Sequence, residues 1–160
     1  MNKKVLSVLV DNTSGVLNRV AGLFSRRGYN IDSLTVGVTQ DPRYSRMTSV
    51  VTGDDDIIEQ IIKQIEKLVD VNKVEVLEDN NSVCRELILT KVKTTPEQRQ
   101  QVMAVADIFR AKIVDVGIDS LIIELTGNQN KLDAFLNLLA DYEILELVRT
   151  GITGLARGTK

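Results

Sequence analysis

The feature that most constrains the fold of this chain is an internal repeat. Thr52-Gly53 precedes DDDIIEQIIKQIEKLVDVNKV, and Thr126-Gly127 precedes NQNKLDAFLNLLADYEILELV, so the two segments align at a constant offset of 74 residues. In both segments, apolar residues recur at the i, i+3, i+4, i+7 spacing of a helix that lies on a core, and a strand-like run follows. The matched apolar pairs are Ile58 with Leu132, Ile61 with Phe135, Ile62 with Leu136 and Ile65 with Leu139. The chain therefore contains two copies of one structural unit.

The front of each half agrees as well, at a different offset. Residues 3–10 and residues 85–92 are strand-like runs, and a helical pattern follows each of them. The first helix has an apolar face made of Val16, Leu17, Val20, Ala21, Leu23 and Phe24. In the second half Pro96 suits the first turn of a helix, whose apolar face is Val102, Val105, Ala106 and Phe109. Each half then has room for a hairpin, around Asp41-Pro42-Arg43 and around Gly117-Ile118-Asp119.

Each half is thus predicted to follow the order βαββαβ, the ferredoxin-like arrangement. The fold class is α+β, with two such domains in tandem, residues 1–78 and residues 79–160. The segment 78–84 (EDNNSVC) is polar and short, and we expect it to join the domains. Because each domain has only a small core, we also expect association between halves or between chains.

Composition excludes several classes of function. The chain has no histidine, which removes the usual general acid–base group near neutral pH and the commonest zinc ligand. The single cysteine, Cys84, leaves no intramolecular disulfide and no cysteine-rich metal framework. Composition therefore disfavours an enzyme and a zinc site, although catalysis by carboxylates or lysine stays open.

Charge and hydropathy argue against nucleic acid and membranes as partners. The net charge is −2, and each half carries ten Lys/Arg and eleven Asp/Glu, so neither half has a basic footprint for nucleic acid or an anionic membrane. No apolar run approaches the ~20 residues of a membrane span, and the N-terminal residues lead into no signal-peptide pattern. The expected location is the cytoplasm.

The stretch VDNTSGVL (10–17) joins the first strand to the first helix. Asn12, Thr13 and Ser14 are expected to supply a side-chain oxygen that caps the helix, and Gly15 lets another group approach the backbone closely. The first N–H groups and the dipole of a helix attract a carboxylate. Two interpretations stay open: a pocket for an amino-acid carboxylate, in which Asn12 holds a second polar group, or a capped turn that binds nothing.

A second stretch, RRGYNI (26–31), ends the same helix. Gly28 stands where a glycine usually terminates a helix, and Asn30-Ile31 opens the next strand. Asn30 is interpreted either as a turn residue or as a residue that faces Asn12 of another chain across a dimer contact. The sequence leaves both interpretations open.

Two further features are interpreted as structural. Asp54-Asp55-Asp56 stands at the start of a helix, where acids favour the dipole, and its counterpart Asn128-Gln129-Asn130 is uncharged, so we predict helix caps rather than a metal site. RNA-binding modules share the βαββαβ order but stack bases on aromatic residues of the sheet. The chain has no tryptophan, and its three phenylalanines, Phe24, Phe109 and Phe135, lie on predicted helices. RNA binding is therefore disfavoured.

The order LSVLVDNTSGVLNRVAGLFSRRGYNIDSLTVG, SRMTSVVTGDD and KLVDVNKV closely resembles the ACT domain at the start of the small regulatory subunits of acetohydroxyacid (acetolactate) synthase. The second half extends the resemblance with VCRELILTKV, IFRAKIVDV, KLDAFLNLL and RTGITGLARG. The resemblance covers nearly the whole chain. The combination of SGVL, RGYNI and TGLARG is far more specific than an ACT domain in general.

This resemblance implies a non-catalytic regulatory subunit of branched-chain amino acid biosynthesis. Such subunits bind a larger catalytic subunit, raise its activity and confer feedback inhibition by valine or another branched-chain product. The resemblance assigns the thiamin diphosphate, magnesium and FAD of the reaction to the catalytic subunit. It also implies a homodimer in which ACT domains pair edge to edge, with the effector at the pairing interface.

Carried onto this sequence, the resemblance implies a valine site shared by two chains. Its residues are Asn12, Gly15, Val16 and Leu17 from one chain and Asn30 and Ile31 from the facing chain. The sequence departs from some relatives at Asn18 and Gly37, which bears on effector selectivity. Two other classes of function remain: a freestanding amino-acid-sensing ACT protein, and an enzyme that uses carboxylates.

Overall fold

The computed structural model describes residues 2–159, which form two compact units. The first unit is Met1–Cys84 together with Ile152–Lys160, and the second unit is Arg85–Gly151. The polypeptide therefore passes between the units twice. These units differ from the predicted ranges 1–78 and 79–160, because residues 79–84 and the segment after Gly151 pack with the first unit.

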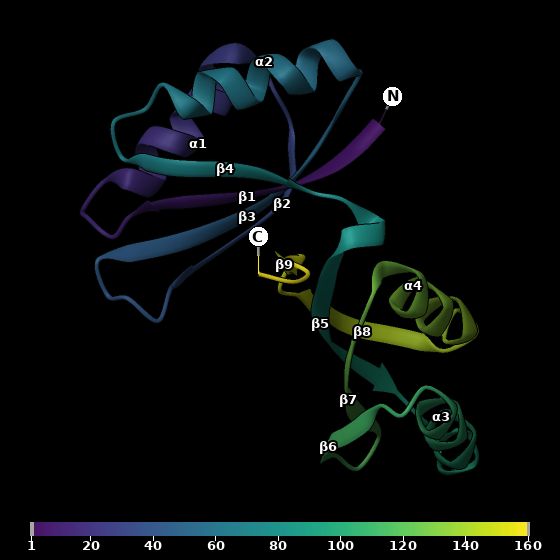
Figure 1. Cartoon of the computed structure of the whole chain (residues 1–160). Helices are drawn as coiled ribbons and strands as arrows, with labels where there is room; N and C mark the ends of the chain where they lie inside the picture. Colours follow the sequence, from purple (N-terminus) through teal and green to yellow (C-terminus); the bar gives the residue numbers. More distant parts are fainter. Residues whose placement is uncertain (1, 160) are drawn as a thin grey trace. The chain divides into compact units, whose positions relative to one another are not determined.

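The first unit follows the predicted βαββαβ order. Its elements are β1 (Asn2–Asp11), α1 (Val16–Arg27), β2 (Ile31–Val38), β3 (Tyr44–Gly53), α2 (Asp55–Glu66) and β4 (Val71–Leu77). The strands form an antiparallel sheet in the order β2-β3-β1-β4, so β2 and β4 are its edges. Both helices lie on the same face of this sheet (Figure 1). The helix-side core contains Leu6, Val8, Val10, Val20, Phe24, Met47, Val51, Ile58, Ile61 and Ile65.

The other face of this sheet is covered by the segment 152–159. Side chains along β3 alternate between faces: Met47 and Val51 lie in the helix-side core, whereas Thr48 and Val50 point away from it. Thr48 and Val50 are nevertheless only 1% and 2% exposed. The covering segment is tied to β2, because Oγ1 of Thr35 donates to the carbonyl of Ile152 at 3.3 Å.

A short strand that the sequence did not predict lies in the covering segment. It is β9 (Thr153–Ala156), which pairs with β5. Gly154 lies against Val83 and Cys84, close to the start of β5. The predicted polar joint at residues 78–84 is a 3₁₀ turn, η1 (Asp79–Asn81), followed by the beginning of that strand. Pairing with β9 explains why this segment is structured rather than a free linker.

The second unit repeats the architecture of the first. Its elements are β5 (Ser82–Lys93, which begins in the first unit), α3 (Pro96–Ile108), β6 (Lys112–Val116), β7 (Ser120–Gly127), α4 (Gln129–Leu138) and β8 (Glu143–Arg149). The strand order β6-β7-β5-β8 matches that of the first sheet, as the repeat predicts. The core contains Ile88, Val92, Val102, Ala106, Leu121, Ile123, Leu125, Leu132, Phe135 and Leu139.

The predicted caps at the starts of α2 and α4 are confirmed. Asp54 accepts from the backbone N–H of Ile57 at the start of α2, and Asn128 accepts from that of Lys131 at the start of α4. Phe24 of α1 and Phe135 of α4 are buried, as predicted, whereas Phe109 is the C-cap that follows α3 and packs partly buried against the second core. Among residues 2–159, no three His, Cys, Asp or Glu side chains are placed to hold a metal ion. Over the same residues, no helix is long and apolar enough to cross a membrane.

Candidate functional site

The start of α1 has no side-chain cap. The cap position is Gly15, which has φ of +84° in the left-handed region, and no side chain accepts a hydrogen bond from the first turn. The predicted capping by Asn12, Thr13 or Ser14 is therefore wrong. The backbone N–H groups of this turn lack the side-chain acceptor that the other three α-helices have. Such a turn, at the positive end of the helix dipole, suits an anion.

Asn12 is occupied elsewhere. Its Nδ2 donates to the carbonyl of Pro42 at 3.0 Å, and its Oδ1 accepts from Oγ of Ser45 at 3.1 Å. Its backbone N–H donates to the carbonyl of Arg43 at 2.7 Å. These bonds tie the end of β1 to the loop between β2 and β3, which is the physical reason that Asn12 does not cap the helix.

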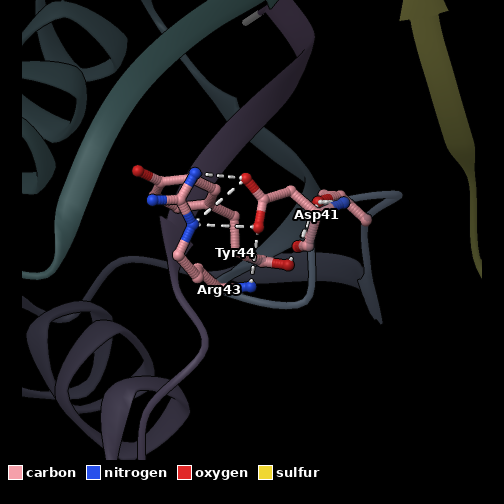
Figure 2. A network of polar contacts seen from close by, with 4 residues as sticks. Asp41, Arg43 and Tyr44 are labelled. Atoms are coloured by element: carbon pink, nitrogen blue, oxygen red, sulfur yellow. Dashed lines mark hydrogen bonds and ion pairs between the residues drawn. The ribbon is translucent and has the colours of Figure 1, made fainter.

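The loop between β2 and β3, to which Asn12 bonds, contains an ion pair between Arg43 and Asp41 (Figure 2). The guanidinium of Arg43 donates to the carboxylate of Asp41, with Nη2 at 2.7 Å from Oδ2, and the backbone N–H of Arg43 donates to Oδ1 at 3.0 Å. These hydrogen bonds lower the pKa of Asp41 from 3.8 to about 2. The guanidinium also lies 5.4 Å from the ring centroid of Tyr44, a cation–π distance. The loop beside the start of α1 is thus preorganised.

Arg19 and Asp70 belong to this region and were missed by sequence reasoning. Nε of Arg19 donates to the carboxylate of Asp70, which raises the pKa of Arg19 above its ordinary value. A Cβ added to Gly15 would lie 2.9 Å from Nη1 of Arg19, so the guanidinium borders the glycine. A cation in the first turn of a helix opposes the dipole. That unfavourable position, one turn after Gly15, was the available signal of a nearby anion.

Val16 and Leu17 differ in the exposure of their side chains. Val16 is 8% exposed and its side chain packs in the core, so only its backbone is available at the helix start. Leu17 is 42% exposed. The prediction that Leu17 belongs to the buried face of α1 is therefore wrong. Its side chain instead supplies an apolar surface next to the uncapped turn.

Asn30 and Ile31 lie at the opposite end of α1 from Gly15. Gly28, with φ of +70°, ends the helix as predicted, and Ile31 begins the edge strand β2. A helix of 12 residues is about 18 Å long. A single amino acid cannot span that length, so one chain does not bring Asn30 and Ile31 to the start of its own α1. The two predicted halves of the site are separate within one chain.

The start of α1 brings several kinds of polar and apolar group together. It offers backbone N–H donors at the start of the helix, the guanidinium of Arg19, the fixed loop between β2 and β3, and the exposed side chain of Leu17. These features fit a small ligand that carries a carboxylate and an apolar side chain.

Comparison with known proteins places this fold and region in a class. Residues 6–73 match the family model described as the AHAS small subunit-like ACT domain, and residues 85–158 match the model described as the small subunit of acetolactate synthase. The class is therefore that of ACT-domain small subunits.

Individual relatives narrow this class to one family. A probable acetolactate synthase small subunit from Archaeoglobus fulgidus is 52% identical over 99% of both chains. The acetolactate synthase small subunit from Haemophilus influenzae is 47% identical over 99% of this chain and 98% of its own. The crystal structure of the acetolactate synthase small subunit from Thermotoga maritima superposes with a TM-score of 0.91 at 44% identity over the whole of both chains. The chain belongs to the acetolactate synthase small subunit family.

Proposed function

We propose that this chain is a non-catalytic regulatory subunit that binds the large catalytic subunit of acetolactate synthase and raises its activity. We further propose that it confers feedback inhibition by valine, or by another branched-chain amino acid, bound between the first units of two copies. The observation that carries the proposal is the uncapped start of α1 at Gly15. Thiamin diphosphate, magnesium and FAD are assigned to the catalytic subunit.

Three kinds of group form the proposed site: backbone N–H groups beside a guanidinium, an apolar side chain, and residues of a second copy. The effector carboxylate is held by the backbone N–H groups from Gly15 to Leu17, with the charge of Arg19 beside them. Leu17 forms part of an apolar wall for the aliphatic side chain. Asn30 and Ile31 of the second copy complete the site. This second copy is needed because one chain separates the two segments by about the length of α1.

The edge strand β2 supports pairing between copies. It ends the sheet order β2-β3-β1-β4, so one side of its backbone has no strand partner among residues 2–159. Its side chains Val36 and Val38 are 47% and 62% exposed. An exposed, apolar edge strand is a template for pairing with another chain, and a twofold axis would use the same strand of both copies.

Inhibition would then operate by linkage. Valine that binds only when two first units are paired in one arrangement stabilises that arrangement, and the catalytic subunit is activated less well by it. The coupling cannot exceed the difference in valine affinity between the two arrangements. This linkage predicts that a substitution in the effector site can change sensitivity to valine without removing activation.

Replacing Gly15 tests this separation. Gly15→Asp places a carboxylate where that of the effector belongs, whereas Gly15→Asn adds a side chain of the same shape without charge and tolerates the left-handed region. We expect Gly15→Asp to abolish valine inhibition, and to do so more completely than Gly15→Asn, while activation survives. The measurement is acetolactate formation by a purified catalytic subunit with each variant, across a range of valine concentrations.

Asn128→Asp is the matched control. It adds the same charge at the start of α4, where aspartate still caps the helix, and it should retain both properties. Loss of activation with valine sensitivity intact in Gly15→Asp would refute the assignment of this region. Failure of the unmodified chain to activate any catalytic subunit, with valine binding retained, would favour a freestanding amino-acid sensor.

A further inference from the structure

A cavity lies on the face of the first sheet that the helices do not cover. It has a volume of about 510 Å³, its floor includes Ser7, Arg46 and Lys73, and its roof is the segment that contains Leu155 and Gly158. A second cavity of about 320 Å³ shares Arg46 and Leu155 with the first. Arg46 therefore borders both. Volumes of this size are typical of sites for small molecules.

The bonding of Arg46 is incomplete. Its Nη1 donates to Oγ of Ser7 at 2.7 Å, and no carboxylate among residues 2–159 lies within ion-pair distance of it. By contrast, Arg19, Arg43 and Arg149 each pair with a carboxylate. A guanidinium has five N–H donors in a fork that matches a carboxylate or phosphate. Arg46 is thus a half-buried cation with donors left over.

The surroundings leave room for an anion beside this guanidinium. Gly37 lies opposite Arg46 in the register of β2 and β3, and a Cβ added there would meet no heavy atom within 4 Å. Lys73 and Glu75 in the lining of the larger cavity pair with each other at 3.7 Å, which leaves the positive charge of Arg46 unbalanced. Thr39 and Thr153 add hydroxyl groups to the smaller cavity. The lining is therefore polar with an excess of positive charge.

The fold itself does not require an arginine at this position. At the repeat offset of 74, the residue of the second unit that corresponds to Arg46 is Ser120. Both residues lie in the strand that pairs with the first strand of their unit, β3 with β1 and β7 with β5. The second unit builds the same sheet without a guanidinium there, so packing alone does not explain Arg46.

We propose that this cavity binds a small organic anion through a carboxylate or phosphate group that pairs with Arg46. The site is separate from the effector site proposed at the start of α1, and it does not depend on that proposal. Because the roof is the segment 152–159, a bound anion holds this segment against the sheet. The ligand would therefore stabilise the covering segment as well as occupy the cavity.

Titration of the whole chain at constant ionic strength tests the site. Inorganic phosphate and acetate serve as separate probes, which distinguish a phosphate ligand from a carboxylate ligand. Binding is followed by NMR through the backbone amide resonances of Gly37 and Gly158, which line the cavities and are present in every variant. We expect saturable binding of at least one probe, and about tenfold or greater loss of affinity in Arg46→Gln. Arg26→Gln removes an equal charge from the exposed last turn of α1, outside the linings of both cavities, and it should bind as the unmodified chain does.

A second measurement guards against a folding defect in Arg46→Gln. Arg46→Lys keeps the charge but loses the fork, so its affinity should lie between those of the other two chains. The probe that binds should also slow amide hydrogen exchange in β9 (153–156). Absence of saturable binding of both probes to the unmodified chain would overturn the proposal. Equal affinities of the unmodified chain and a folded Arg46→Gln or Arg46→Lys variant would overturn it too.

Discussion

The carboxylate of Asp41 shows how a single residue fixes the loop beside α1. Three donors of Arg43 lower its pKa from 3.8 to about 2. A group whose pKa is lower in the folded state stabilises that state above its unfolded pKa. The contribution of Asp41 is therefore complete above about pH 4 and is lost as the pH falls through about 2.

NMR titration of the Asp41 side-chain carboxyl carbon checks this prediction. We expect a midpoint of about 2 in the unmodified chain and a return toward 3.8 in Arg43→Gln, because the donors are then removed. A midpoint near 3.8 for Asp41 in the unmodified chain would contradict the bonding shown in Figure 2.

Residue patterns predicted the two ends of α1 but not how the side chains near its start bond. Gly15 and Gly28 were placed correctly at the two ends of α1, because a left-handed position strongly favours glycine. Asn12 was misassigned because its partners, Pro42 and Ser45, are distant in sequence. A polar residue before a helix has several acceptors and donors within reach, and only the tertiary structure selects among them.

At the scale of the element, the start of α1 differs from the starts of the other three α-helices in having no side-chain cap. Asp54, Thr95 and Asn128 cap α2, α3 and α4 through their side chains. The start of α1 has no such bond. A helix start without a side-chain cap has N–H groups that lack a side-chain acceptor, and a bound ligand can supply one.

Alanine substitution at two helix starts measures the difference. Asp54→Ala should lower the free energy of unfolding by about 1 kcal/mol, because it removes the acceptor of the Ile57 N–H. Ser14→Ala should change it by less than about 0.5 kcal/mol, since Ser14 caps nothing through its side chain. Urea unfolding of both variants gives the comparison, and Asp54→Asn, which keeps a capping oxygen, is the control. An equal loss in Ser14→Ala would mean that α1 is capped in solution.

The elements themselves were predictable except for β9. Strong apolar periodicity and turn residues located the two hairpins, including β6 and β7 on either side of Gly117-Ile118-Asp119. β9 has only four residues, Thr153–Ala156, and two of them are glycine and alanine. Its structure depends on a pairing with β5, more than sixty residues earlier in the chain. No local pattern carries that information.

At the scale of the whole molecule, the segment after Gly151 returns to the first unit and makes a close contact there at Gly154. A Cβ added to Gly154 would lie 2.6 Å from Sγ of Cys84 and 2.9 Å from the carbonyl oxygen of Val83. These distances are shorter than a side chain tolerates, so β9 needs glycine to lie against β5. The repeat predicted two domains, but it could not show that the segment after Gly151 returns to the first unit, because nothing in the first half corresponds to it.

Gly154→Ala tests this contact. We expect β9 to shift from β5, with a loss of about 1–3 kcal/mol in the free energy of unfolding of the first unit. Hydrogen exchange should become faster in 153–156 and unchanged in the core of the second unit. Gly37→Ala, where an added Cβ meets nothing within 4 Å, is the matched control and should be close to neutral. Equal stability of the two variants would show that β9 is not held as closely as described.

The return of the segment 152–159 to the first unit has a consequence for synthesis of the chain. A ribosome that has completed β4 still has to add the whole second unit before the residues that cover Thr48 and Val50 are made. At ordinary elongation rates this takes roughly 3 to 13 s. During that interval the nascent first unit has one uncovered sheet face, which other chains or chaperones can contact. The first unit can therefore be completed only after the second unit has been translated.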